Sequence, residues 1–336
     1  MLRTKVPAYV PLISLLLGSG AMLALGFVGK EKEQPTTTHS ARVCDVTYQR
    51  VRGYNSIKPL LSTEHECESE RYAGLKHAIG SYLEQEKNSG TISEAGFYLR
   101  DFRKAEWTMY NGDVQFEPGS LMKVPFLMTY LRMAEKDPTV MARSYRMPAG
   151  TPEPKAVHFP PTSSMEPDKP YSVAELLKLA IIHSDNQAVN VLLKNIDITM
   201  LHRTFTELGL PDMKGSDTRY PLSPKAFSVF MKAIYNGTYL SLDDSELAVS
   251  LLMASEFGQG LKAGLPPGTR IAHKFGESFG GQDWQLHETA LIYIGADPYL
   301  ITVMTQGPRM EALPAVLANV SKLAYDEMVR LNGAVQ

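Results

Sequence analysis

The spacing of hydrophobic residues predicts regular structure from about residue 69 onward. Apolar side chains recur at helical intervals over 69–87 and again over 119–134, so we expect a helix in each range. Between them, segments 95–101 and 106–111 alternate between apolar and polar residues and carry aromatic rings, which is typical of a β-hairpin. This region should therefore run as a helix, two strands and a second helix.

The second half of the chain combines capped helices with late strands. Ser172 and Glu175 form a capping-box pattern ahead of an apolar run, which predicts a helix over 172–183. Ser223 followed by Pro224 is a second helix start. The remaining pattern predicts three strands and a closing helix, at 270–276, 289–294, 299–306 and 311–330. Strands at both ends with helices between them indicate a mixed α/β (α+β) fold, in which a five-stranded antiparallel sheet is flanked by helices and carries an inserted all-helical lobe.

The amino terminus carries Arg3 and Lys5 and then an uncharged apolar run over residues 6–29. This run is long enough to cross a hydrocarbon layer at about 1.5 Å per residue. The basic start predicts that the rest of the chain is exported to the periplasm or the cell surface. Two interpretations stay open: a signal anchor that holds the protein in the membrane, and a signal peptide that is cleaved.

Composition predicts where the segments of the chain begin and end, and it argues against nucleic-acid and metal binding. We expect a signal segment at 1–30, a polar linker and extension at 31–68, and the main domain at 69–336. After export, Cys44 and Cys67 can form a disulfide. Lys and Arg number 34 against 36 Asp and Glu, and no basic run is interleaved with aromatic residues, which argues against nucleic-acid binding. We expect no metal site and no cofactor, because the His-Glu pairs near 65 and 287 lack metal-ligand spacing.

Ser120 and Lys123 form the first motif that carries chemistry. Residues three apart on a helix share one face, so the lysine amine can lie beside the serine hydroxyl. A serine needs a base to act as a nucleophile, and a lysine whose pKa is lowered by burial can supply it. Taken alone, this spacing also fits an exposed helix turn.

Two further motifs are weaker by themselves. Ser184-Asp185-Asn186 follows the capped helix and can project polar groups into a cleft, or can simply cap the next helix. Lys274-Phe275-Gly276 lies on a late strand, where the lysine can attract a carboxylate and Gly276 can let a substrate backbone approach closely. The plainer interpretation of Lys274 is an edge-strand charge that discourages aggregation.

The three motifs together resemble the signature set of the class A β-lactamases and their penicillin-binding relatives, over about residues 69–331. This resemblance implies that Ser120 is the acylated nucleophile and that Lys123 is its general base. It places Ser184 and Lys274 on the proton-relay and carboxylate side and makes Asn186 a substrate ligand. It also implies that the backbone N–H groups of Ser120 and Glu277 form the oxyanion hole, with residues 275–277 lining the substrate site.

The chain departs from that family in two places. The interval 207–223 has no Glu-x-x-x-Asn, the omega-loop pattern whose glutamate activates the deacylating water. We interpret Glu207 as a solvated charge at the end of the preceding helix, and Glu166 lies in a Pro-rich loop with no matching family position. Phe275 stands where the family has Thr or Ser, and it can either line the cleft edge or point inward.

These residues lead to a functional expectation with two alternatives. We expect an exported serine hydrolase that cleaves an amide through Ser120, either a β-lactam or a D-Ala-D-Ala-type cell-wall peptide. The first alternative is a penicillin-binding-like D,D-peptidase that deacylates slowly. The second is a domain that binds cell-wall peptides without turnover. The partners we expect are this small-molecule or peptidoglycan substrate and the membrane at the N-terminal segment.

Overall fold

The computed structural model describes residues 44–152, 157–212 and 220–332. These described residues all fall within one compact unit, Cys44–Gln336. The predicted signal segment at 1–30 lies outside the described residues. Within the described ranges, no helix combines the length and the apolar character that crossing a membrane would require.

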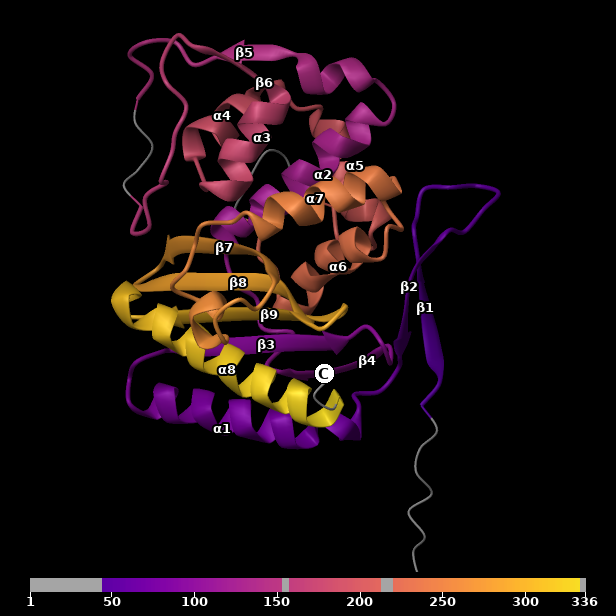
Figure 1. Cartoon of the computed structure of the whole chain (residues 1–336), viewed down its shortest axis with the longest axis vertical. Helices are drawn as coiled ribbons and strands as arrows, with labels where there is room; N and C mark the ends of the chain where they lie inside the picture. Colours follow the sequence, from indigo (N-terminus) through magenta and orange to yellow (C-terminus); the bar gives the residue numbers. More distant parts are fainter. Residues whose placement is uncertain (1–43, 153–156, 213–219, 333–336) are drawn as a thin grey trace, which may run out of the picture. The chain divides into compact units, whose positions relative to one another are not determined.

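A five-stranded antiparallel sheet forms the centre of this unit (Figure 1). Its strand order is β4-β3-β9-β8-β7, so the first hairpin of the domain pairs directly with the last strand. This arrangement confirms the predicted sheet assembled from both ends of the domain. The strand bounds are β3 Glu94–Asp101, β4 Glu106–Tyr110, β7 Ile271–Gly280, β8 Asp283–Ile294 and β9 Asp297–Gly307.

Two helices, α1 (Ala73–Asn88) and α8 (Leu313–Asn332), lie together along one face of the sheet (Figure 1). Their apolar sides pack on alternate strand residues such as Phe97 and Leu99, and burial of these side chains forms one hydrophobic core. Both helices were predicted from their apolar periodicity.

The remaining helices build the second lobe around a separate core, and α6 packs on the other side of strands β3 and β9. The predicted capping box is present, because the Ser172 hydroxyl accepts from Glu175 N and the Glu175 carboxylate accepts from Ser172 N. The lobe also holds the short pair β5 (Ser144–Arg146) and β6 (Pro170–Ser172). Its helices are α2 Lys123–Ala134, α3 Val173–Ile182, α4 Asn186–Asn195, α5 Ile198–Glu207, α6 Pro224–Tyr235 and α7 Leu242–Met253.

The described part of the extension forms an antiparallel hairpin of β1 (Val46–Arg50) and β2 (Leu60–His65). A disulfide between Cys44 and Cys67 closes its base, as the sequence indicated. The strands themselves were not predicted, because several apolar residues of the hairpin face solvent and blur the pattern of alternation.

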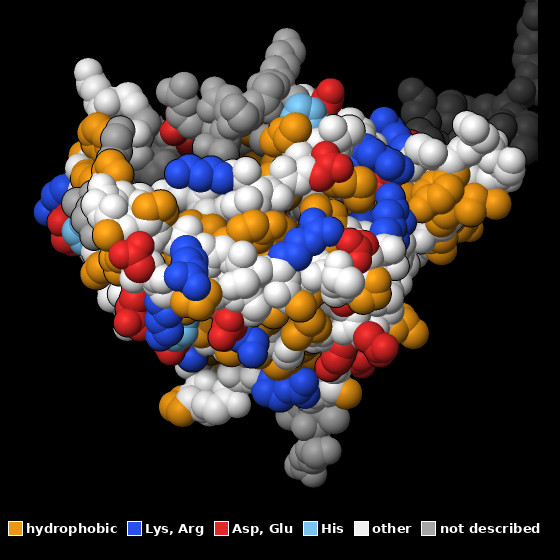
Figure 2. Space-filling model, turned by 90° about the horizontal axis from the view of Figure 1, so that it is seen from above, with side chains coloured by type: hydrophobic (Ala, Val, Ile, Leu, Met, Phe, Trp, Pro, Cys, Tyr) orange, Lys and Arg blue, Asp and Glu red, His pale blue; other side chains and the backbone are white. Residues whose placement is uncertain are grey.

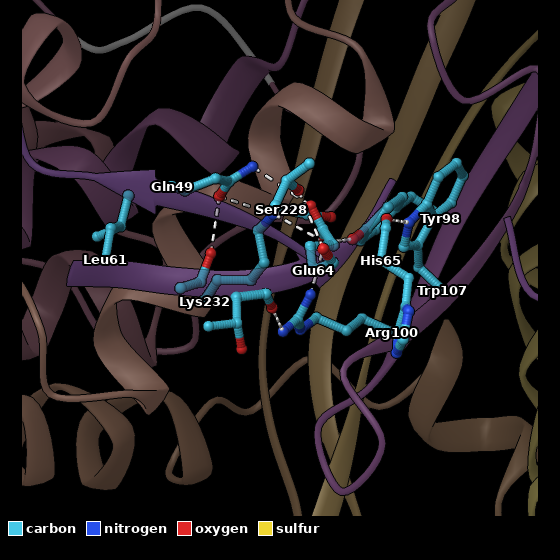
Figure 3. A network of polar contacts seen from close by, with 12 residues as sticks. Gln49, Leu61, Glu64, His65, Tyr98, Arg100, Trp107, Ser228 and Lys232 are labelled. Atoms are coloured by element: carbon cyan, nitrogen blue, oxygen red, sulfur yellow. Dashed lines mark hydrogen bonds and ion pairs between the residues drawn. The ribbon is translucent and has the colours of Figure 1, made fainter. Parts of the chain in front are cut away.

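A buried ionic network fastens this hairpin to the main domain (Figure 3). The Glu64 carboxylate of β2 forms ion pairs with Arg100 Nη1 from β3 at 2.7 Å and with Lys232 Nζ from α6 at 3.2 Å. It also accepts the Tyr98 hydroxyl. All of these side chains are almost completely buried, so each charge depends on its partner for solvation. The extension is therefore an integral part of the fold through Glu64.

Candidate active site

Ser120 lies at the point where a tight turn enters helix α2. Residues Gly119–Met122 form a 3-10 turn (η2) that leads directly into α2, and the Ser120 side chain is half-buried. Gly119 has a φ of 55°, and a Cβ there would lie 2.2 Å from the Glu277 carbonyl oxygen. Only glycine fits this close approach in the left-handed region. The turn is thereby pressed against strand β7, which brings Ser120 next to the backbone of Glu277.

The Lys123 side chain is buried, with 3% of its surface exposed. Its Nζ donates to the Ser184 carbonyl oxygen at 2.6 Å, to Ser184 Oγ at 3.1 Å and to Asn186 Oδ1 at 2.8 Å. Burial lowers the pKa of Lys123 to about 7, against the opposing attraction of the Asp185 and Glu277 carboxylates. A lysine in this state is poised between its charged and neutral forms near neutral pH.

Ser120 and Lys123 line one pocket of about 420 Å³, together with Asn186 and Glu277. The pocket also has apolar walls, which come from η2, α2, α4 and the loop at 157: Met122, Phe126, Val157, Val189 and Leu193. We expected a direct contact between the serine hydroxyl and the lysine amine. Within the described residues no hydrogen bond joins them, because the amine is hydrogen-bonded to Ser184 and Asn186 instead.

The Ser184 backbone adopts a φ of 59°, which is unusual for a residue other than glycine. Asp185 holds this corner in place: its carboxylate caps α4 by accepting Gln187 N at 2.9 Å and Ala188 N at 3.2 Å, and it also accepts Met165 N at 3.0 Å. Such a strained residue persists only where its surroundings fix it, and these positions are concentrated at functional sites.

Ser184 Oγ connects the two lysines of the motif set. Lys274 Nζ donates a hydrogen bond to Ser184 Oγ at 3.0 Å, and the same hydroxyl oxygen accepts a hydrogen bond from Lys123 Nζ. Lys274 is completely buried, and desolvation together with the Lys123 charge holds its pKa well below the ordinary value. Lys274 and Ser184 are not among the described residues that line the pocket, and hydrogen bonds through Ser184 Oγ connect them to Lys123, which does line it.

Glu277 contributes its side chain as well as its backbone to the site. The carboxylate accepts His158 N at 3.1 Å and Phe159 N at 3.4 Å, so it ties the loop at 158–159 to strand β7. Burial raises the pKa of Glu277, and these two N–H groups partly offset the effect. An acidic side chain thus stands at the pocket edge beside Ser120.

Two residues expected at the substrate site have neighbours within the protein itself. The Phe275 ring stacks on Phe257 at 4.1 Å and meets Phe159 edge-on, inside the core beneath α8, so it does not line the pocket beside Ser120. The Lys274 amine nonetheless lies 4.2 Å from the centre of the Phe275 ring, so the two side chains meet at this edge strand of the sheet. At Gly276, a Cβ would lie 2.4 Å from the Pro118 carbonyl oxygen. The glycine therefore admits the protein's own turn rather than a substrate backbone.

A polar group on β8 positions the turn that carries Ser120. The backbone of Glu117 donates to Gln285 Oε1 at 2.9 Å, and its carbonyl accepts His287 Nε2 at 3.0 Å. His287 Nδ1 accepts Thr305 N, and burial lowers the pKa of this imidazole to about 4, so it stays neutral with its proton on Nε2. Sequence reasoning missed both residues, although their alternation on one strand could have placed them on the same face.

The two glutamates considered as water-activating groups lie elsewhere. Glu166 is exposed and pairs with Lys169 at 2.8 Å. Our interpretation of Glu207 as a solvated charge is wrong, because it is buried and bonds the Tyr239 hydroxyl at 2.9 Å and Arg203 Nη2 at 2.8 Å. Neither residue lines the Ser120 pocket. The described residues also contain no group of three or more His, Cys, Asp or Glu side chains that could hold a metal ion.

Comparisons with known proteins agree with the overall fold. A family model described as the beta-lactamase enzyme family matches residues 75–328. The fold is similar to that of a PBP-A mutant solved as its acyl-enzyme complex with penicillin G, at 20% identity and a TM-score of 0.64, covering 77% of this chain and 97% of that one. It is also similar to a β-lactamase from Xanthomonas campestris pv. campestris, at 20% identity and a TM-score of 0.65, covering 76% and 98%.

A β-lactamase from Burkholderia phymatum is a further structural relative, at 18% identity and a TM-score of 0.62, covering 76% of this chain and 99% of that one. Similarity at these identities shows a shared fold. The family model spans most of the sequence and includes the turn, corner and strand that build the pocket. The chain therefore belongs to the beta-lactamase enzyme family.

Proposed function

We propose that this protein is an exported serine hydrolase that cleaves an amide through an acyl-enzyme on Ser120 and deacylates slowly. The observation that supports this most strongly is the buried Lys123 amine in the same pocket as the Ser120 hydroxyl, with a pKa of about 7. A neutral lysine at that place can take the hydroxyl proton, which an ordinary surface lysine does not do at neutral pH.

Acylation starts when the neutral Lys123 amine turns from Ser184 or Asn186 to accept the Ser120 proton. Ser120 Oγ then bonds to the substrate carbonyl carbon, and the backbone N–H groups of Ser120 and Glu277 donate to the developing oxyanion. As the C–N bond breaks, the protonated Lys123 amine, which lines the pocket, gives the proton that it took from Ser120 to the leaving nitrogen, while the Ser184 hydroxyl stays hydrogen-bonded to it. Lys274, bonded to the same hydroxyl, holds Ser184 in place for this transfer.

Slow deacylation follows from how the pocket carboxylate is engaged. Water must lose a proton as it attacks the acyl carbonyl, so this step needs a base near the ester. Glu277 lines the pocket, but two backbone N–H groups of the 158–159 loop hold its carboxylate and lower its basicity. Glu166 and Glu207 do not line it. An acyl group on Ser120 should therefore persist.

The substrate class and the compartment are also part of this proposal. A β-lactam or a D-Ala-D-Ala-type cell-wall peptide fits the family and the motif set, and the uncharged run at 6–29 supports export and membrane attachment. A second candidate is a domain that binds cell-wall peptides without turnover. It is favoured by one observation, the engagement of the Lys123 amine by Ser184 and Asn186 rather than by Ser120.

Pre-steady-state hydrolysis of a chromogenic cephalosporin separates these functions. We expect a burst of about one equivalent per protein followed by a much slower steady state, as in any enzyme whose acyl intermediate accumulates. Sustained fast turnover would contradict slow deacylation and point to Glu277 as an active base. Absence of a burst at every concentration, with Ser120→Ala identical to wild type, would favour binding alone.

A further inference from the structure

The β1–β2 hairpin carries an unusual share of the exposed apolar surface. Nine large hydrophobic side chains are exposed in the described part of the chain, and five of them lie on this hairpin between residues 46 and 60. They are Val46, Tyr48, Tyr54, Ile57 and Leu60. Figure 2 shows hydrophobic side chains gathered with Lys and Arg side chains at the right-hand end of the molecule, where the hairpin lies in Figure 1.

A pocket of about 540 Å³ opens between the hairpin and the α5–α6 region. Its floor is aliphatic, and Tyr48, Tyr54 and Ile57 stand at its sides with a large fraction of their surface exposed. The aliphatic residues come from both sides of the pocket: Val51, Leu61, Leu208, Leu210 and Val229. This site is separate from the Ser120 pocket, because the two share no lining residue.

Three cations line the same pocket, and its described lining contains no carboxylate. Arg50 donates to the Lys58 carbonyl oxygen at 2.6 Å and lies over the Tyr48 ring. Arg52 and Lys58 form no side-chain hydrogen bond or ion pair with any described residue. Glu207, whose side chain lies beside Gly53, is already bonded to Arg203 and Tyr239, and Glu64, which accepts from the lining residue Gln49, is paired with Arg100 and Lys232.

Positive charge above an aliphatic floor is complementary to an anion that carries an apolar chain. We propose that this pocket binds the head group and upper chain of an anionic lipid. Arg50, Arg52 and Lys58 would pair with the phosphate, and Tyr48, Tyr54 and Ile57 would lie at the lipid–water boundary, where aromatic and basic residues are favoured. On the sequence prediction that residues 6–29 sit in a membrane, this hairpin is the first described element after it.

The inference is independent of catalysis, so its test uses residues outside the Ser120 site. Full-length protein in a neutral detergent is titrated with phosphatidylglycerol or with phosphatidylcholine, and the lipid retained is counted by native mass spectrometry. The test variant is Arg52→Gln with Lys58→Gln. The matched control is Lys178→Gln with Lys262→Gln, which removes the same charge from two exposed lysines elsewhere.

We expect wild type and control to retain one phosphatidylglycerol in preference to phosphatidylcholine. The test variant should bind it roughly 30-fold more weakly, the factor for losing two cations of about 1 kcal/mol each. Its circular dichroism spectrum and urea midpoint should equal those of wild type, which shows that it is folded whether or not Ser120 is acylated. The proposal would be overturned if both lipids were retained equally or if the test variant bound phosphatidylglycerol as tightly as wild type. It would also be overturned if inorganic phosphate alone bound equally tightly, or if the hairpin formed a dimer instead.

Discussion

The rate of acylation should depend on pH through the Lys123 amine. Lys123 can accept the Ser120 proton only in its neutral form, and burial lowers its pKa from 10.5 to about 7. The neutral form is populated above the pKa and lost below it. Acylation should therefore rise with pH, with a midpoint near 7, and should fall about tenfold for each unit of pH below the midpoint.

The structure also gives the size of this effect. A lysine with the ordinary pKa of 10.5 is neutral in about one molecule in 3000 at pH 7. At a pKa of about 7, half of the molecules are neutral at the same pH. Burial of Lys123 therefore supplies on the order of a thousandfold more of the reactive form, equivalent to roughly 4–5 kcal/mol.

The assay measures the second-order rate constant for acylation by a penicillin from pH 5 to 9, with circular dichroism at each pH to verify the fold. Glu277→Gln is an informative variant because the Glu277 carboxylate raises the Lys123 pKa, so its loss should move the midpoint to lower pH. A flat profile in wild type, or a midpoint near the ordinary lysine value, would refute Lys123 as the base. An unshifted midpoint in the variant would refute the coupling to Glu277.

Two further predictions concern stability. Glu64→Gln leaves the buried Arg100 and Lys232 charges without their carboxylate, so we expect the free energy of unfolding to fall by about 3 kcal/mol with the disulfide intact. Urea denaturation measures this loss. A change below about 1 kcal/mol would contradict the role of the network. Phe275→Thr removes a ring from the aromatic cluster and should cost about 3 kcal/mol, whereas Phe275→Leu should cost less. Stronger binding of carboxylate substrates by Phe275→Thr, without loss of stability, would restore the cleft-edge position for this residue.

Sequence patterns predicted the elements whose signals are local. The capping box at Ser172 and the apolar periodicity of the first and last helices depend on neighbours within one or two turns, and the structure contains them. Ser120 and Lys123, three residues apart, line the same pocket, although Ser120 lies in the 3-10 turn before α2 and no hydrogen bond joins the two described side chains. Local spacing alone was enough for the capping box and the two helices.

The features that were missed depend on contacts between distant parts of the chain. Glu207 is buried because Tyr239, on a later segment, reaches back to it, and no pattern around residue 207 indicates this. The amine of Lys123 is engaged by Ser184 and Asn186, which lie some 60 residues away in sequence. The position of Phe275 likewise depends on Phe257 and Phe159, which lie outside its own strand.

The central claim is that Ser120 becomes covalently acylated, and intact-mass analysis tests it most directly. Protein incubated with penicillin G is measured over time, and the modified peptide is mapped by fragmentation. We expect one adduct per chain, located on Ser120, slow to disappear in wild type and absent in Ser120→Ala. An adduct on another residue, or none under conditions where the protein is folded, would contradict the account.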